Sequence, residues 1–408
     1  MFKWVSLFII IKKIIVLAIT ITTALLSPLY PKTKIRPNPW HIRVLLDEGT
    51  TKKQKTFDLS CPHGFFLLKN PVSKKKTHLK TKKLRVYISS KGISLKKEGA
   101  IFKNGSFKRL SIAPAKGYLS TNDQCYDGTL MFDITKNKSF QVINWVDLED
   151  YIYSVLRYEV YQSWPIDMHK VQAIASRTYA SRCMKEARQT GKSYDIKNNN
   201  FHQVYNGTHE YLHLKKAIKE TYNTILSYEG GPALTMFDAC CGGCIPGKMG
   251  YFDFKKTPYL ARKYPCRYCK NYSLYRWEKK YDFDELANLL RSSPRTSAIA
   301  KTAGRLKNIK AKEIDGSGIP HKIVLYGRKK TVEIKGSDFF EVVRKKAKSR
   351  SFSIAKKGWN IILSGRGFGH LVGMCQRGAR ELVKRGWNVK KILSFYYPGT
   401  KLGRLTNL

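Results

Sequence analysis

The pattern of apolar and polar residues changes character twice along the chain. Short runs of strand-forming residues between turn signals fill the chain up to about residue 145 and return at 305–364. Between and after them, apolar residues recur at helical spacing. The clearest strand runs are 41–46, 84–88 and 130–134, and the expected helices are 148–158, 165–189, 213–224, 283–291 and 376–384. This order predicts an α+β fold, with a helical core flanked by mostly antiparallel β segments.

The first 27 residues resemble an export signal. Lys3, Lys12 and Lys13 supply positive charge ahead of an apolar run at 14–26, which is short for a membrane span. We therefore expect an exported protein of the periplasm or cell envelope. The segment is either cleaved or retained as an anchor in the cytoplasmic membrane.

The rest of the chain divides by composition. Residues 28–40 are rich in Pro and Lys and are expected to form a linker, and 41–408 form one domain in four parts. The expected parts are an N-terminal β part at 41–145, a helical catalytic part at 146–230, a Cys-rich metal-binding part at 231–280 and a C-terminal β part with a Gly-rich motif at 281–408.

The charge balance is strongly basic. Lys and Arg number 76 against 29 Asp and Glu, which gives a formal net charge of +47. Such a chain attracts polyanions, although a lysine-rich solvated surface explains the same numbers. The export signal and the lack of a recognised binding motif argue against a nucleic-acid partner.

Glu159 is the first candidate for chemistry. It stands at the expected end of a helix among the aromatic residues Tyr158, Tyr161 and Trp164. An apolar pocket raises the pKa of a carboxylic acid, so that it can donate a proton near neutral pH. The alternative is a helix-end glutamate paired with a surface lysine.

Two long motifs carry a family resemblance. Residues 148–151 read Leu-Glu-Asp-Tyr, Glu159 precedes Trp-Pro at 164–165, and Arg-Thr-Tyr-Ala follows at 177–180. Near the C-terminus, 365–379 contain Gly-Arg-Gly-Phe-Gly-His and then Val-Gly-Met-Cys-Gln-Arg-Gly-Ala. In this order the motifs resemble the stage II sporulation protein D (SpoIID) family of lytic transglycosylases, which also includes the LytB-type amidase enhancers.

The resemblance implies a function. It places the family's catalytic glutamate on Glu159, in a lytic transglycosylase that cleaves the bond between N-acetylmuramic acid and N-acetylglucosamine. The expected substrate is a peptidoglycan glycan strand lacking stem peptides, and the product ends in a 1,6-anhydro sugar. One carboxylate serves as acid and then as base, so the chemistry needs no cofactor. The alternative is a non-catalytic, wall-binding amidase enhancer, with a wall amidase as its partner.

Further residues are implied to bind the substrate. From the helical motif, Lys170, Gln172 and Arg177 are expected to line the cleft, with a buried salt bridge as the alternative for Arg177.

The Gly-rich motif supplies three more candidates. His370 is expected to assist substrate binding or to pair with Glu159, or else to stabilise its loop. Gln376 opens a helix whose N-terminus favours anions. Tyr397 is expected to stack on a sugar or to be a core aromatic residue.

The chain departs from the family's usual residues at three places. Val160-Tyr161 replaces Met-Pro, Leu371 replaces Gly, and Cys375 replaces Ser.

Five of the nine cysteines cluster in the sequence. Cys241-x-x-Cys244 and Cys266-x-x-Cys269 have nearly the spacing of a four-thiolate zinc site. We therefore expect structural zinc on these four residues, with Cys240 as a substitute ligand. Disulfides and free thiols are the alternatives, because exported chains often carry disulfides.

Overall fold

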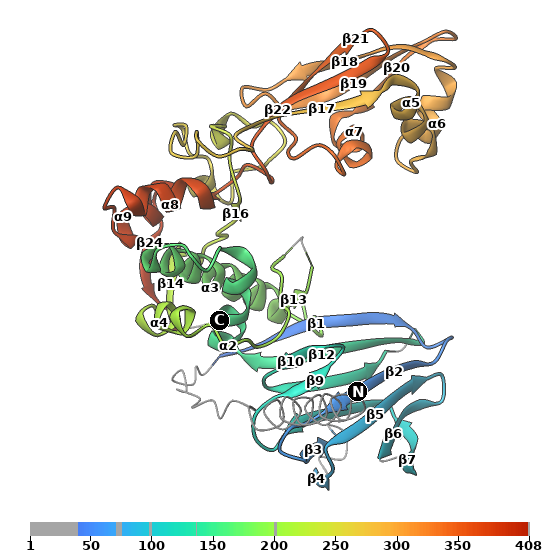
Figure 1. Cartoon of the computed structure of the whole chain (residues 1–408), viewed down its shortest axis with the longest axis vertical. Helices are drawn as coiled ribbons and strands as arrows, with labels where there is room; N and C mark the ends of the chain where they lie inside the picture. Colours follow the sequence, from blue (N-terminus) through green and yellow to red (C-terminus); the bar gives the residue numbers. More distant parts are fainter. Residues whose placement is uncertain (1–39, 71–75, 98–99, 136, 200–201, 407–408) are drawn as a thin grey trace, which may run out of the picture. The chain divides into compact units, whose positions relative to one another are not determined.

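A computed structural model describes residues 40–70, 76–97, 100–135, 137–199 and 202–406 (Figure 1). The predicted export signal and almost all of the predicted linker lie outside these residues. Among the described helices, none combines the length and the apolar character needed to cross a membrane.

The N-terminal part contains two mostly antiparallel sheets, and a short parallel strand forms one edge of the first. In spatial order, the first sheet contains β13 (Ile196–Lys197), β1 (His41–Thr50), β12 (Ser139–Asp147), β11 (Thr129–Ile134), β8 (Arg109–Pro114), β3 (Phe65–Lys69) and β4 (Lys76–Lys80). The second contains β10 (Gln124–Tyr126), β9 (Leu119–Thr121), β2 (Lys55–Ser60), β5 (Lys83–Ser89), β6 (Gly92–Lys97) and β7 (Ala100–Phe107). In the first sheet β13 pairs in parallel with β1, and the other strand pairs described for these two sheets are antiparallel.

Alternating apolar residues of the two sheets form the core of this part. Along β5, Leu84, Val86 and Ile88 are buried while the residues between them are more exposed, as a two-residue period requires. The Phe57 ring on β2 contacts Phe132 on β11, with centroids 5.6 Å apart. This contact joins the two sheets.

The helical part follows β12 directly. Helix α2 (Leu148–Glu159) packs against α3 (Ile166–Gln189), and α3 also contacts α4 (Leu212–Glu220), α8 (Gln376–Lys384) and α9 (Val389–Tyr396). The β14 strand (Thr224–Tyr228), which also packs on α3, lies between β15 (Gly231–Pro232) and β24 (Lys401–Arg404). The C-terminal segment thus returns to the central helix.

Residues between about 276 and 366 form a second α/β region with its own core. It contains two three-stranded antiparallel sheets. In spatial order, the first contains β17 (Arg276–Asp282), β22 (Asn360–Arg366) and β21 (Phe352–Lys357). The second contains β18 (Leu306–Ile314), β19 (Pro320–Gly327) and β20 (Thr331–Lys335). Helices α5 (Phe283–Ser292), α6 (Ser297–Thr302) and α7 (Gly336–Val343) pack against these strands (Figure 1). Trp277, Leu325, Phe339 and Leu363 belong to the shared core.

One short pairing brings distant segments together. The β16 strand (Phe237–Asp238) pairs in parallel with β23 (Met374–Cys375). Beyond it, Cys240 and Phe368 exchange two backbone hydrogen bonds of 3.2 and 2.7 Å. The start of the Cys-rich part and the Gly-rich motif therefore lie side by side. The predicted α+β class with mostly antiparallel sheets is confirmed.

Candidate active site and cysteine cluster

Glu159 is the last residue of α2. Asp147 begins this helix, and its carboxylate accepts a 2.7 Å hydrogen bond from the Glu149 backbone N–H. At the other end Val160 takes an extended conformation, while its N–H still donates to Leu156 O at 3.2 Å. The helix thus ends where the Glu159 side chain enters a cavity.

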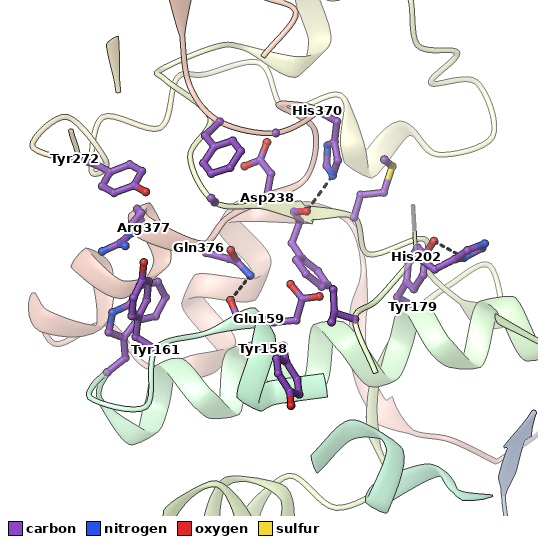
Figure 2. A pocket seen from close by; sticks show the side chains of 17 residues that line it. Tyr158, Glu159, Tyr161, Tyr179, His202, Asp238, Tyr272, His370, Gln376 and Arg377 are labelled. Carbon is purple, nitrogen blue, oxygen red and sulfur yellow. Dashed lines mark hydrogen bonds between the residues drawn. The ribbon is translucent and has the colours of Figure 1, made fainter. Parts of the chain in front are cut away.

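The cavity has a volume of about 480 Å³ and a mixed aromatic and polar lining (Figure 2). Its walls come from the end of α2, from the β16–β23 region and from the start of α8. The lining residues are Tyr158, Glu159, Tyr161, Trp164, Tyr179, His202, Val204, Met236, Phe237, Asp238, Ala239, Tyr272, Phe368, Gly369, His370, Gln376 and Arg377. Such a surface suits a sugar, since aromatic faces pack on its C–H groups while polar groups meet its hydroxyls.

Burial raises the pKa of Glu159 from 4.5 to about 7. The Val204 backbone N–H and the Gln376 side chain oppose this shift, because hydrogen bonds favour the ionised form. Near neutral pH both protonation states are populated, and the carboxyl group can either donate or accept a proton.

Gln376 connects α8 to the end of α2. Its Nε2 donates to the Glu159 backbone carbonyl at 2.9 Å and lies 3.4 Å from Gln172 Oε1. Gln172 is fully buried, and its own Nε2 donates to Ser176 Oγ at 3.2 Å. Gln376 therefore borders the cavity, whereas Gln172 supports it from behind and is not part of the lining.

His370 lines the cavity but is held by the backbone. Its Nε2 donates to Phe237 O at 2.9 Å, and its Nδ1 accepts from the Val372 N–H at 3.1 Å. Burial lowers its pKa to about 4, so the ring is neutral. Both ring nitrogens are used, which matches the loop-stabilising alternative and leaves neither nitrogen for pairing with Glu159.

Three other predicted binding residues lie away from the cavity lining. Lys170 pairs with Asp167 and Glu220, and the Tyr397 hydroxyl donates to Met236 O at 2.8 Å inside the core. Arg177 is fully buried and binds Glu149 with two N–H groups, which is the salt-bridge alternative. These side chains support the fold around the cavity and do not border it.

Asp238 is a second carboxylic acid in the cavity wall, and its role was not predicted from the sequence. It is 7 % exposed, and burial raises its pKa well above the usual value. Its Oδ2 accepts a 2.6 Å hydrogen bond from the Leu371 N–H. Leu371 has φ +69°, a conformation usually taken by glycine. Asp238 therefore stabilises the unusual backbone at the Gly-to-Leu departure.

Four buried cysteines converge next to this cavity wall. The Sγ atoms of Cys241, Cys266, Cys269 and Cys375 all lie within 4.8 Å of one another, and Cys241 and Cys269 are 3.7 Å apart. All nine cysteines fall in the described part of the chain, and all are free. The predicted disulfide alternative is therefore absent there. Three of the four predicted ligands are brought together.

Cys375 stands in the cluster where Cys244 was expected. Cys244 Sγ instead faces the carbonyl of Ser317 at 3.6 Å. The β16–β23 pairing carries Cys375 to Cys241, whose N–H donates to Cys375 Sγ at 3.3 Å, as does the Gly378 N–H. The C-x-x-C spacing alone could not reveal a fourth ligand from a distant strand, although the Ser-to-Cys departure was visible.

The four thiols also perturb each other's ionisation. A hydrogen bond from Cys241 lowers the pKa of Cys266, and the same bond raises the pKa of Cys241. Hydrogen bonds from neighbouring thiols lower the pKa of Cys269 in the same way. The thiol that gains such a hydrogen bond ionises more readily than its donor, and the thiolate is the form of cysteine that binds metal ions.

Comparisons with known proteins agree with this description. Residues 136–228 match a family model described as Stage II sporulation protein, and 265–373 match a domain of unknown function that spans most of the second α/β region. An uncharacterized protein of Brachyspira hyodysenteriae is 31% identical over 310 residues, covering 73% of this chain and 77% of the relative. The Stage II sporulation protein D of Bacillus subtilis is 28% identical over 290 residues, covering 64% and 76%.

The fold and the site define an α+β protein in which a helix-end glutamate of near-neutral pKa faces an aromatic-lined cavity. The chain belongs to the stage II sporulation protein D family. A third relative is the Amidase enhancer of Bacillus subtilis, 25% identical over 287 residues, which cover 61% of this chain and 39% of that protein. Membership of the family supports a role connected with the cell wall.

Proposed function

We propose that this protein is a peptidoglycan lytic transglycosylase that cleaves the bond between N-acetylmuramic acid and N-acetylglucosamine in glycan strands. The observation that carries the proposal is Glu159, a carboxyl group with a pKa of about 7 in an aromatic-lined cavity of about 480 Å³. Family membership supports a role connected with the cell wall, which agrees with a glycan substrate.

Glu159 serves twice in this reaction. Its protonated carboxyl group donates to the glycosidic oxygen, so that the bond to the anomeric carbon of the muramyl residue breaks and the next sugar leaves as an alcohol. The resulting carboxylate then takes the proton of the muramyl 6-hydroxyl as that oxygen bonds to the anomeric carbon. Glu159 is regenerated and no water is consumed.

The second carboxyl group of the cavity supports this one-acid scheme. Enzymes that hydrolyse glycosides usually employ two carboxyl groups, one of them ionised. Asp238 is buried, has a strongly raised pKa and is hydrogen-bonded to the Leu371 backbone. Its carboxyl oxygen is held by the Leu371 N–H and its side chain is buried, so Glu159 is the group that we expect to exchange protons with the substrate.

The test compares wild type, Glu159→Gln and Glu210→Gln on glycan strands without stem peptides. Glu210 is an exposed glutamate outside the cavity lining and serves as the matched control. Mass spectrometry should detect anhydro-muramyl ends with wild type and Glu210→Gln only. If wild type binds strands but forms no such ends, the proposed reaction is wrong.

The alternative is a non-catalytic enhancer of a wall amidase, a candidate because one relative is named Amidase enhancer. An enhancer would increase the rate of a purified wall amidase equally well as wild type or as Glu159→Gln. The enzyme hypothesis expects anhydro product without any amidase present.

We also propose that Cys241, Cys266, Cys269 and Cys375 hold a structural zinc ion. Zinc–sulfur bonds of about 2.3 Å in a tetrahedron place sulfur atoms about 3.8 Å apart, and the Cys241 and Cys269 Sγ atoms are 3.7 Å apart. The cluster thus fits the ion. Four protein ligands leave no open position, so zinc would cross-link the Cys-rich segment to α8 and take no part in the reaction.

The substrate also places the protein in the cell. Glycan strands lie outside the cytoplasmic membrane, so we propose an exported protein that works in the periplasm or cell envelope. Fractionation of cells that express the full chain, followed by protease accessibility of the intact cells or spheroplasts, tests this location.

A further inference from the structure

Arg377 sits in an aromatic cage at one side of the Glu159 cavity (Figure 2). The centre of its guanidinium group lies 4.7 Å from the Tyr161 ring, 5.0 Å from the Trp164 ring and 4.3 Å from the Tyr272 ring. These distances are typical of cation–π contacts. The cage assembles three segments that are distant in the sequence, and all four residues line the cavity.

The guanidinium group has no polar partner in the part of the chain that the structure describes. The hydrogen bond recorded for Arg377 is made by its backbone N–H, to Ala239 O. An arginine carries five N–H donors, and the rings fix its position without accepting conventional hydrogen bonds from all of them. Donors therefore remain for a ligand. Tyr161, which is 60% exposed, shows that this side of the cavity reaches the surface.

The location on the helix also favours an anion. Arg377 is the second residue of α8, and the first turn of this helix contains no acidic residue. A cation at a helix N-terminus is unfavourable because the helix dipole is positive there. A negatively charged ligand would relieve this repulsion and accept from the guanidinium fork, whose geometry matches a carboxylate.

We propose that Arg377 is a specificity-determining residue that binds the lactyl carboxylate of a muramyl residue. The inference rests on the proposed function, because the ligand is the glycan strand that Glu159 cuts. A free lactyl group carries one carboxylate, which becomes an uncharged amide when a stem peptide is attached. The expectation that the substrate lacks stem peptides comes from the family resemblance, and what Arg377 adds is a residue of this chain that would read the free carboxylate.

Tyr161, one wall of the aromatic cage, is a residue at which this chain departs from the family pattern. It stands where the family usually has proline, and proline offers no aromatic ring. One wall of the cage thus comes from a residue that departs from the family pattern. Tyr161→Pro should therefore weaken selection by Arg377, while Glu159 keeps its place at the end of α2.

The experiment compares stem-peptide-free strands with the same strands whose lactyl carboxylates are capped as methylamides. Capping should raise KM of wild type about tenfold or more, the effect of losing a charge-assisted hydrogen bond. Arg377→Gln should show this higher KM on both substrates, and Arg377→Lys should retain part of the discrimination. Arg385→Gln, which removes an exposed charge just after α8, is the matched control and should behave as wild type.

The inference is overturned if Arg377→Gln, folded as judged by an unchanged melting temperature, still discriminates capped from uncapped strands as wild type does. If wild type cuts neither substrate, the proposed reaction fails, and the same comparison is made by equilibrium binding of the two kinds of strand. Selective binding of uncapped strands that is lost in Arg377→Gln supports the carboxylate site, and equal binding by both proteins refutes it.

Discussion

Replacing Arg177 by methionine tests whether this residue stabilises the fold or binds substrate. Its Nε and Nη2 donate to the Glu149 carboxylate at 2.9 and 2.5 Å, and its Nη1 donates to Thr224 O at 3.1 Å. Both side chains of the pair are buried. Arg177→Met would leave the Glu149 carboxylate buried without its cation, which costs about 3–5 kcal/mol of unfolding free energy.

The size of this effect can be checked within the same helix. Arg182 and Glu186 form an exposed pair on α3, and Arg182→Met should cost only about 0.5 kcal/mol. The double variant Arg177→Met/Glu149→Leu should recover most of the loss, because an apolar pair of similar volume often replaces a buried ion pair without penalty. Urea unfolding followed by circular dichroism measures all four proteins.

The same series distinguishes the two interpretations of Arg177. A structural role predicts a lower urea midpoint and an unchanged KM for the fraction that remains folded. If Arg177→Met instead unfolds at the wild-type urea concentration and raises KM for glycan strands, the buried ion pair would be the wrong explanation and a binding role would be restored.

Three further predictions follow from the cavity and the cluster. The pKa of Glu159 rises from 4.5 to about 7 in the folded protein, so its contribution to stability is present below pH 4.5 and is lost as the pH rises to 7. Relative to Glu159→Gln, wild type should therefore lose about 3 kcal/mol of unfolding free energy over this range, as measured by urea titrations. Cys375→Ser should lower the zinc content measured by elemental analysis, whereas Cys244→Ser should keep it, and a reversed result would restore the spacing-based ligand set. Gly378→Ala would place a methyl group 2.5 Å from Cys266 Sγ, and should therefore lose zinc and melt several degrees lower than the control Gly403→Ala, whose methyl group meets nothing within 4 Å.

Features that depend on local sequence were predictable. The helices that carry Glu159 and Arg177 begin and end within a residue or two of the predicted bounds, because helical periodicity and capping are local properties. The desolvating surroundings of Glu159 were also visible from the neighbouring aromatic residues. Its raised pKa agrees with that expectation.

Features that depend on distant pairing were not predictable in the same way. The family resemblance suggested that Lys170 and Arg177 line the cleft, but acidic partners on other elements bind both of them. The C-x-x-C pattern likewise selected Cys244, since it counts residues along the chain and ignores strand pairing. Only the alignment of β16 with β23 brings Asp238 and Cys375 to adjoining positions.

The residues at which this chain departs from the family pattern each contact another residue that gives the departure a role. Cys375 would be an ordinary cap of α8 if Cys241, Cys266 and Cys269 did not surround it, and together the four form a possible metal site. Tyr161 similarly gains a role from Arg377, whose guanidinium group lies 4.7 Å from the centre of its ring. Leu371 takes a glycine-like backbone conformation, and its N–H donates a hydrogen bond to the Asp238 carboxyl group, which stabilises that conformation. Asp238 and Arg377 line the Glu159 cavity, and Cys375 directly precedes Gln376, which also lines it. Because each departure contacts its partner, substitutions at the two members of a pair should not be additive in their effect on stability.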